Sequence, residues 1–196
     1  MVGKLPRSGL LEHGVREGRA KSCAPLNFTL TINMKKVISI IILLLPSIVM
    51  AGGPSMPDGY RRPNEAELAS PNRDEDRYRY EMAVGDFNGD GLVDGALLAI
   101  DDNNKELAVF VFVCTANDQV YRWYKVASLE YRDIKYTGVK SLTPQTIYYY
   151  QDITGEDKAE LNVTNDSFEL FQFEGAKSVF YYEKESNQFK RVWISK

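Results

Sequence analysis

The chain has 196 residues and a formal net charge of −3, with 24 basic and 27 acidic side chains. It contains one histidine, His13, and two cysteines, Cys23 and Cys114. This acidic balance argues against a nucleic-acid partner, because such binding depends on clustered Lys and Arg side chains that neutralise phosphates.

A secretory signal peptide is predicted at residues 34–51. Met34 and two lysines precede an apolar run at residues 37–50, which ends in the small-x-small pattern of a cleavage site. We therefore expect cleavage after Ala51. The run is short for a membrane span, which needs roughly 17 to 25 residues, although a buried core helix is an alternative explanation. The mature protein is expected in the periplasm or outside the cell, with no membrane attachment.

Residues 1–33 precede this signal and have three possible explanations. They are an in-frame extension upstream of the true start, a long leader, or a vector-derived segment. Without residues 1–51 the chain keeps 17 basic and 25 acidic residues, a net charge of −8. It also loses His13 and Cys23, so we expect the mature monomer to contain no disulfide.

The composition of the mature chain limits its chemistry. With no histidine and a single cysteine it cannot form a Ser-His-Asp or Cys-His catalytic site, or an ordinary zinc site. Carboxylates, hydroxyls and amides remain, the hard oxygen ligands that suit calcium or magnesium. About 145 residues are enough for one domain that buries roughly two thirds of its unfolded surface.

Residues 52–77 are expected to form an irregular leader with one short helix. The segment is rich in Pro, Gly and charged residues. Asn64 occupies an N-cap position and Glu67 follows three residues later, which is the spacing of a capping box. This signal predicts one or two helical turns.

Residues 78–196 have the pattern of a β domain made of short strands. The segments are aromatic or β-branched and are bounded by Asn, Asp, Gly or Lys. They lie at residues 107–113, 120–126, 146–150, 168–173, 179–182 and 189–194. Both faces of 168–173 carry apolar side chains, so this strand is expected to be central. We predict an all-β fold, an antiparallel meander of two related β-units that forms an open sheet or sandwich.

The clearest functional signal is the sequence Asp-Phe-Asn-Gly-Asp-Gly-Leu-Val-Asp at residues 86–94. Oxygen side chains occupy positions 1, 3, 5 and 9, glycine occupies position 6, and the backbone carbonyl at position 7 supplies another oxygen. This spacing predicts a calcium (Ca2+) site formed by Asp86, Asn88, Asp90, Leu92 through its carbonyl, and Asp94. Position 12 is Leu97, not the Glu of an EF-hand, so we expect a loop between two strands. A hairpin turn without an ion is the alternative.

Residues 84–98 resemble the signature of FG-GAP and VCBS-type repeats, found in integrin-like propellers and in many exported bacterial proteins. The resemblance implies a calcium ion bound in a loop between adjacent strands, with the five residues named above as its ligands. It covers only about 20 residues, so it implies a scaffold and an ion but says little about function.

A weaker copy of this loop begins 66 residues later. The possible second calcium site comprises Asp152, Thr154, Glu156, Lys158 and Glu160. An aspartate stands where the first loop has its glycine, so we expect a looser loop, and a degenerate repeat that keeps only the turn is the alternative. Because a propeller needs roughly four to eight blades, two repeats cannot close one.

Two classes of function remain open. The first is a non-catalytic exported module that binds a protein or a glycan, for example as an inhibitor or immunity partner, with calcium supporting its structure. The second is a carboxylate-dependent hydrolase such as a small glycosidase, which needs two carboxyl groups about 5 to 9.5 Å apart. We favour the module, because the clustered carboxylates are already assigned to the ion loops. The tyrosines at 148–150 and 181–182 form either a binding face or ordinary strand packing.

Overall fold

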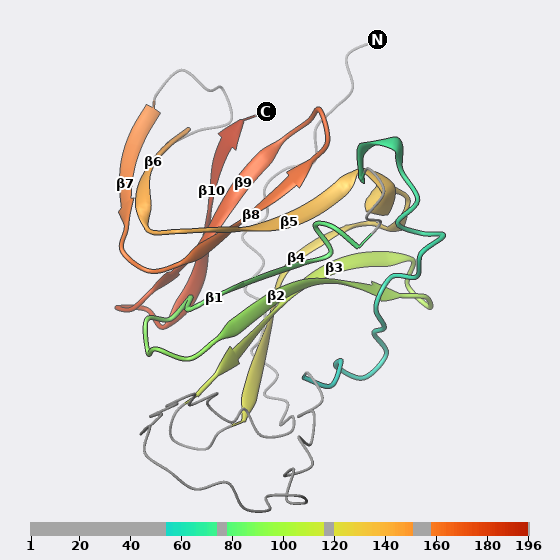
Figure 1. Ribbon diagram of the computed structural model, residues 1–196, viewed down its shortest axis with the longest axis horizontal. Helices are drawn as coiled ribbons and strands as arrows, with labels where there is room; N and C mark the ends of the chain where they lie inside the picture. The colour runs from blue at the N-terminus through green and yellow to red at the C-terminus, as the bar shows by residue number, and fades with distance from the viewer. Residues whose placement is uncertain (1–53, 74–77, 116–119, 151–157, 196) are drawn as a thin grey trace, which may run out of the picture.

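Figure 1 shows the computed structural model, which describes residues 54–73, 78–115, 120–150 and 158–195. The segment 1–33 and the predicted signal peptide, residues 34–51, lie outside the described residues. The strands are β1 (Met82–Gly85), β2 (Asp94–Asp101), β3 (Glu106–Cys114), β4 (Tyr121–Glu130), β5 (Thr137–Leu142), β6 (Gln145–Tyr150), β7 (Lys158–Val163), β8 (Ser167–Gln172), β9 (Lys177–Glu183) and β10 (Gln188–Ser195). Two short 3-10 helices are η1 (Pro71–Arg73) and η2 (Tyr131–Tyr136). The prediction of an all-β fold with open antiparallel sheets is confirmed.

The first sheet is a four-stranded meander in the order β1-β2-β3-β4. Its two central strands, β2 and β3, are buried on both faces, which explains their nearly continuous apolar sequences. On the outer face, Phe110 packs with Met56 and Tyr60 of the leader. The leader therefore covers a sheet face that would otherwise expose large apolar side chains.

The second sheet has six strands in the order β5-β8-β9-β10-β6-β7. Strand β8 lies between β5 and β9 and is almost fully buried, so the prediction of a central strand at this place is confirmed. Strand β5 was missing from the sequence interpretation, because Gly138 and Lys140 interrupt its apolar pattern. Its pairing with β8 takes the second sheet out of simple meander order.

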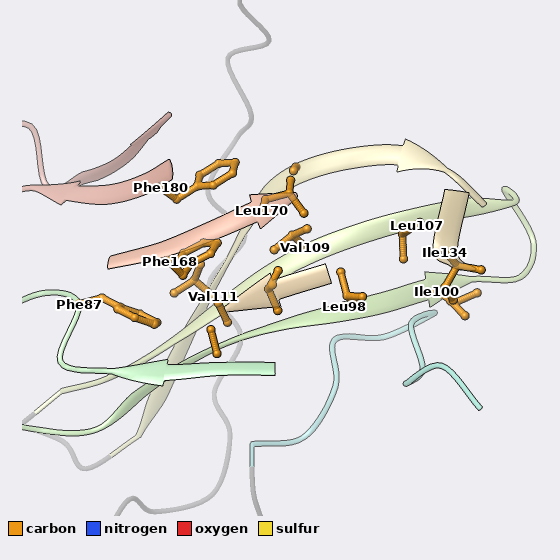
Figure 2. Packing of buried hydrophobic residues seen from close by; sticks show 14 of the residues in the cluster. Phe87, Leu98, Ile100, Leu107, Val109, Val111, Ile134, Phe168, Leu170 and Phe180 are labelled. Atoms are coloured by element: carbon orange, nitrogen blue, oxygen red, sulfur yellow. The ribbon is translucent and has the colours of Figure 1, made fainter. Parts of the chain in front are cut away.

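The main core lies between the two sheets (Figure 2). Leu98 and Val111 of the first sheet meet Phe168 and Phe180 of the second, and all four side chains are at most 2% exposed. Phe168 stacks on Phe180 with ring centroids 5.1 Å apart and contacts Phe87 at 5.4 Å. Phe87 belongs to the loop predicted to bind calcium, so the main core fixes one side of that loop.

The two sheets also meet along the edge where β1 lies beside β5. The Ser141 hydroxyl accepts a hydrogen bond from the Val84 amide at 2.8 Å and donates one to the Val84 carbonyl at 2.7 Å. Nearby, the Val139 amide donates to the Tyr80 carbonyl at 2.8 Å. Groups on the free edge of β1 are thereby satisfied, which protects that edge from pairing with another chain.

The leader contains one helical turn that begins with a capping box. The Asn64 side chain accepts from the Glu67 amide at 3.0 Å, and the Glu67 carboxylate accepts from the Asn64 amide at 2.8 Å. Three residues before Asn64, Arg61 and Ile100 exchange two backbone hydrogen bonds, which dock the leader on strand β2. Among the described residues, no helix has the length and apolar character needed to cross a membrane.

Candidate functional site

The Asp86 loop, residues 86–94, joins β1 to β2 at the edge of the first sheet. The last register pair before it is Gly85 with Asp94. Gly89 and Gly91 have positive φ angles of 75° and 85°, a region that a side chain with a Cβ resists. The glycine at position 6, Gly91, therefore has the left-handed conformation that this tight turn requires.

The Asp86 carboxylate curls the loop around itself. Its Oδ1 accepts hydrogen bonds from the Gly89 and Asp90 amides at 2.8 and 3.0 Å, and its Oδ2 accepts from the Gly91 amide at 2.8 Å. Successive backbone N–H groups that converge in this way form an anion-binding concavity, which here holds the loop's own first carboxylate.

The side chains of Asn88 and Asp90 lie next to each other on the outer part of the loop. Asn88 Nδ2 donates to Asp90 Oδ2 at 3.0 Å, and Asn88 Oδ1 accepts from the Asp90 amide at 2.9 Å. Asp90 Oδ1 accepts from the Leu92 amide, also at 2.9 Å. The structure therefore brings together the first three predicted ligand side chains, those of Asp86, Asn88 and Asp90.

Asp94 has a different position, at the buried base of the loop. Its side chain is 1% exposed, and it accepts from the Phe87 and Asn88 amides at 3.0 and 3.3 Å and from the Cys114 amide at 2.9 Å. Burial raises the pKa of Asp94 to about 7, and the three backbone N–H groups oppose this rise. Both of its oxygens are used by the backbone, so Asp94 ties the loop to the end of β3.

The donor set of the loop fits a calcium ion in part. Asp86, Asn88 and Asp90 offer the oxygen side chains that calcium prefers, and the carbonyl of Leu92 follows at the expected position. Within the part of the chain that the structure describes, no three His, Cys, Asp or Glu side chains gather as a ready-made metal cluster. The loop contributes two exposed or half-buried carboxylates and one amide, with Asp94 engaged elsewhere.

The turn between β7 and β8 holds the Asp86 loop from the side of the second sheet. Asp166 Oδ2 accepts from the Asp86 amide at 2.9 Å, and Asn165 Nδ2 donates to the Phe87 carbonyl at 3.3 Å. A Cβ on Gly89 would lie only 2.7 Å from Asn165 Oδ1. Sequence reasoning missed both residues. An Asn-Asp pair between two strands indicates a turn, but nothing in it indicates which loop the turn contacts.

The possible second calcium site lies largely outside the described residues, because Asp152, Thr154 and Glu156 are there. Lys158 and Glu160 are described and belong to strand β7, where both are exposed. The Lys158 ammonium lies 5.4 Å from the centre of the Tyr150 ring. These two residues therefore take part in a strand and not in a closed loop.

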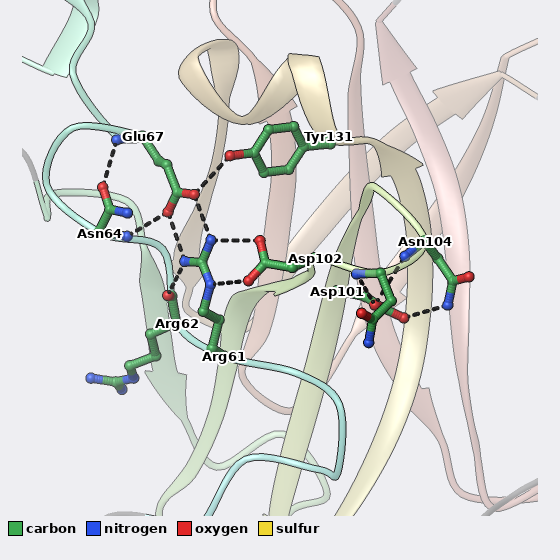
Figure 3. A network of polar contacts seen from close by, with 9 residues as sticks. Arg61, Arg62, Asn64, Glu67, Asp101, Asp102, Asn104 and Tyr131 are labelled. Carbon is green, nitrogen blue, oxygen red and sulfur yellow. Dashed lines mark hydrogen bonds and ion pairs between the residues drawn. The ribbon is translucent and has the colours of Figure 1, made fainter.

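A second polar cluster, not anticipated from the sequence, forms around Arg61 (Figure 3). The Arg61 guanidinium makes two contacts with Glu67, at 2.6 and 2.8 Å, and two with Asp102, also at 2.6 and 2.8 Å. Tyr131 donates to Glu67 Oε1 at 2.7 Å. This Arg61 cluster joins the leader to the β2–β3 turn and to η2.

The ion pair with Arg61 sets the charge state of Glu67. The Arg61 guanidinium lowers the pKa of Glu67 to about 2, helped by the Asn64 amide and the Tyr131 hydroxyl. Asp102 has a lowered pKa for the same first reason, its hydrogen bonds from Arg61. These two carboxyl groups therefore remain ionised at neutral pH and are poor proton donors.

Cys114 is the last residue of strand β3. The residue is 2% exposed and is disulfide-bonded. Its bonding partner lies outside the described residues. The expectation that the chain contains no disulfide concerned the mature monomer without residues 1–51 and stays a prediction for that form.

The tyrosines of the sequence analysis divide into packed and exposed residues. Tyr149, Tyr150, Tyr181 and Tyr182 are half-buried, which agrees with strand packing. Tyr148 is 64% exposed, and a residue not singled out from the sequence, Trp193, is 41% exposed.

Comparisons of the chain with family models, with curated proteins and with solved structures gave no match.

Proposed function

We propose that this protein is an exported calcium-binding β module that binds a protein or glycan partner and does not catalyse a reaction. The observation that carries the proposal is the Asp86 loop, whose carboxylates are oriented but not neutralised. No described Lys or Arg forms an ion pair with Asp86 or Asp90. The FG-GAP and VCBS-type signature of the loop supports the same proposal.

In this proposal Asp86, Asn88, Asp90 and the Leu92 carbonyl hold the ion. A bound calcium ion supplies the positive charge that the loop lacks and links its oxygen ligands. Asp94 does not bind the ion directly. It accepts hydrogen bonds from backbone amides and so fixes the buried end of the loop that carries the other ligands. The Asn165–Asp166 turn connects the same loop to the second sheet, so ion binding strengthens the junction between the two sheets.

The alternative, a carboxylate-dependent hydrolase, requires a pair of acids outside the ion loops. Glu67 and Asp102 are such a pair, but both are ion-paired with Arg61. A glycosidase acid needs a raised pKa, whereas the pKa of Glu67 is lowered to about 2. A third acid, Glu106, is ion-paired with Lys125 at 2.6 Å. These observations favour the binding module over the hydrolase.

Calcium-dependent melting tests the proposal. If free calcium exceeds the dissociation constant a hundredfold, the fold gains about 2.7 kcal/mol, since the unfolded chain cannot bring the ligands together. For a domain of this size the melting midpoint in calcium should lie several degrees above that in chelator. Asp90→Ala should abolish most of this difference, and Glu156→Ala should reduce it less.

Asp58→Ala is the matched control, because Asp58 lies on an exposed turn of the leader far along the chain from the loop. It should keep the full calcium response. A wild-type midpoint that is identical in calcium and in chelator would show that the loop is only a turn. A larger loss from Glu156→Ala than from Asp90→Ala would reverse the ranking of the two loops.

Export is tested by N-terminal sequencing of the protein recovered from the producing cell. We expect the mature chain to begin at Gly52, after cleavage at Ala51. Such a chain contains Cys114 as its only cysteine, so its monomer cannot keep an intramolecular disulfide. Recovery of a monomer that still begins within residues 1–33 would contradict the export proposal and the net charge of −8 derived from it.

A further inference from the structure

One face of strand β10 is covered at its start and open at its end. Side chains alternate along a strand, so Phe189, Arg191 and Trp193 lie on the same face. Phe189 packs against the main core, whereas Trp193 is 41% exposed. The first sheet covers this face of β10 at Phe189. Further along the strand, around Arg191 and Trp193, the same face is accessible.

Arg191 is held in a fixed orientation on this face. Its Nε donates to the hydroxyl of Ser178, a fully buried residue, at 3.0 Å. Its guanidinium lies 3.9 Å from the centre of the Trp193 ring and 5.3 Å from that of Phe180. A guanidinium that stacks on aromatic rings and is hydrogen-bonded through Nε has its two Nη groups pointed in defined directions.

The Nη groups of Arg191 have no acceptor among the described residues. The contrast with Arg61 is direct, because Arg61 uses both of its Nη groups on carboxylates and on one carbonyl. None of the ion pairs of the described residues includes Arg191. Arg191 is thus an ordered cation whose strongest donors are available to a ligand.

A pocket of about 90 Å³ opens beside Arg191 and Trp193. Its wall is largely apolar and includes Leu170 and Phe171, while Thr137 and Gln172 add polar groups. The pocket is smaller than the roughly 150 Å³ cavity that admits a benzene ring. A carboxylate on one or two methylene groups fits such a volume better than a six-membered sugar ring.

We propose that this Arg191 pocket binds an acidic side chain, Asp or Glu, of a protein partner. The inference rests on the proposed function and names the kind of partner that the module takes. Arginine binds carboxylates through two parallel hydrogen bonds, which its fixed Nη groups are placed to make. Trp, Tyr and Arg are also the residues that dominate the affinity of protein interfaces, and they do so around small desolvated pockets.

The test uses two capped amino acids, acetyl-Glu-amide and acetyl-Gln-amide, titrated into the purified full chain. The chain has two tryptophans, so the indole N–H signals in an NMR spectrum report on Trp193 and, as an internal reference, on Trp123. We expect the Glu probe to shift the Trp193 signal saturably at millimolar concentration and to leave Trp123 unchanged. The Gln probe should bind at least tenfold more weakly.

Arg191→Lys keeps the charge but removes the planar fork, so it should weaken binding of the Glu probe at least tenfold. Arg132→Lys is the matched control, because the Arg132 side chain is 79% exposed and lies on η2.

Equal binding of the Glu and Gln probes to the wild type overturns the proposal, and this comparison needs no variant. Full binding by a folded Arg191→Lys protein also overturns it, and so does glucuronate binding tenfold more tightly than the Glu probe, which would indicate a glycan. The calcium melting test depends on the Asp86 loop of the first sheet, whereas this test depends on Arg191 of the second sheet. Either proposal can therefore fail while the other holds.

Discussion

The Asp86 loop and the Arg61 cluster both gather carboxylates, but they balance the negative charge in different ways. In the Arg61 cluster, Glu67 and Asp102 share one guanidinium through four contacts of 2.6 to 2.8 Å. In the loop, the two carboxylates that are not fully buried, Asp86 and Asp90, accept, among the described residues, only backbone N–H groups and the Asn88 amide. A backbone N–H orients a carboxylate but leaves its full charge in place. This difference supports the proposal that the loop, and not the cluster, binds a cation.

The largest expected effect comes from Asp94, the one aspartate of the loop that is fully buried. Asp94→Ala removes the acceptor for the amides of Phe87, Asn88 and Cys114. A buried donor left without an acceptor costs roughly 1 to 3 kcal/mol, so the free energy of unfolding should fall by about 3 to 5 kcal/mol. Urea denaturation measures this loss, in chelator so that no ion contributes.

Asp86→Ala is the matched change at the other end of the loop. The amides that Asp86 accepts lie on the exposed side, where water can replace the carboxylate, so the loss should be about 1 kcal/mol. An equal loss of unfolding free energy for the two variants would mean that the burial of Asp94 does not make its hydrogen bonds more important than those of Asp86.

The second comparison separates the two glycines with positive φ. Gly89→Ala and Gly91→Ala both place a Cβ in the left-handed region, at a cost of roughly 1 to 2 kcal/mol. Only at Gly89 does the new Cβ meet another side chain, that of Asn165, at 2.7 to 2.9 Å. We therefore expect Gly89→Ala to destabilise the fold by about 1 kcal/mol more than Gly91→Ala.

A double-mutant cycle decides whether the contact with the second sheet causes this difference. In an Asn165→Ala background the clashing amide is absent, so the costs of Gly89→Ala and Gly91→Ala should become equal within about 0.5 kcal/mol. If the difference between the costs of Gly89→Ala and Gly91→Ala persists in that background, the strain lies in the loop itself. It would then not come from a clash with the β7–β8 turn.

The strands were predictable because their signals are local. The apolar and aromatic segments predicted at 107–113 and 189–194 correspond to β3 and β10, each of which is one residue longer at both ends. Strand β5 was not predicted, because Gly138 is there for a tertiary reason: a Cβ at this position would lie 2.7 Å from the ring of Phe171. Close approach to another strand leaves no local pattern of its own.

The sequence predicts the local geometry of the candidate site but not its long-range contacts. Alternate oxygen side chains and Gly91 are consecutive in the sequence, and the loop does bring Asp86, Asn88 and Asp90 together. The burial of Asp94 depends on the Cys114 amide, which lies 20 residues away along the chain. The contact of Asp166 with the loop spans 80 residues. Spacing alone predicts the same role for all three aspartates of the loop, because neither of these long-range contacts leaves a pattern in the sequence.

The smallest predicted effect concerns the pH dependence of the Arg61 cluster. Glu67 has a pKa of about 2 in the folded protein and an ordinary value of 4.5 when unfolded. A lowered carboxyl pKa contributes stability that is fully present above pH 4.5 and is lost as the pH falls towards 2. The contribution should be about 1 kcal/mol, less than the full shift implies, because Arg61 is 38% exposed and solvent screens the pair.

The stability difference between wild type and Glu67→Gln should therefore be about 1 kcal/mol at pH 7 and should shrink steadily below pH 4.5. Glu185→Gln, at an exposed glutamate of the β9–β10 turn, should show no such trend. A Glu67→Gln difference that stays constant from pH 7 to about pH 2 would mean that the hydrogen bonds of this side chain, and not its charge, hold the leader to the β2–β3 turn.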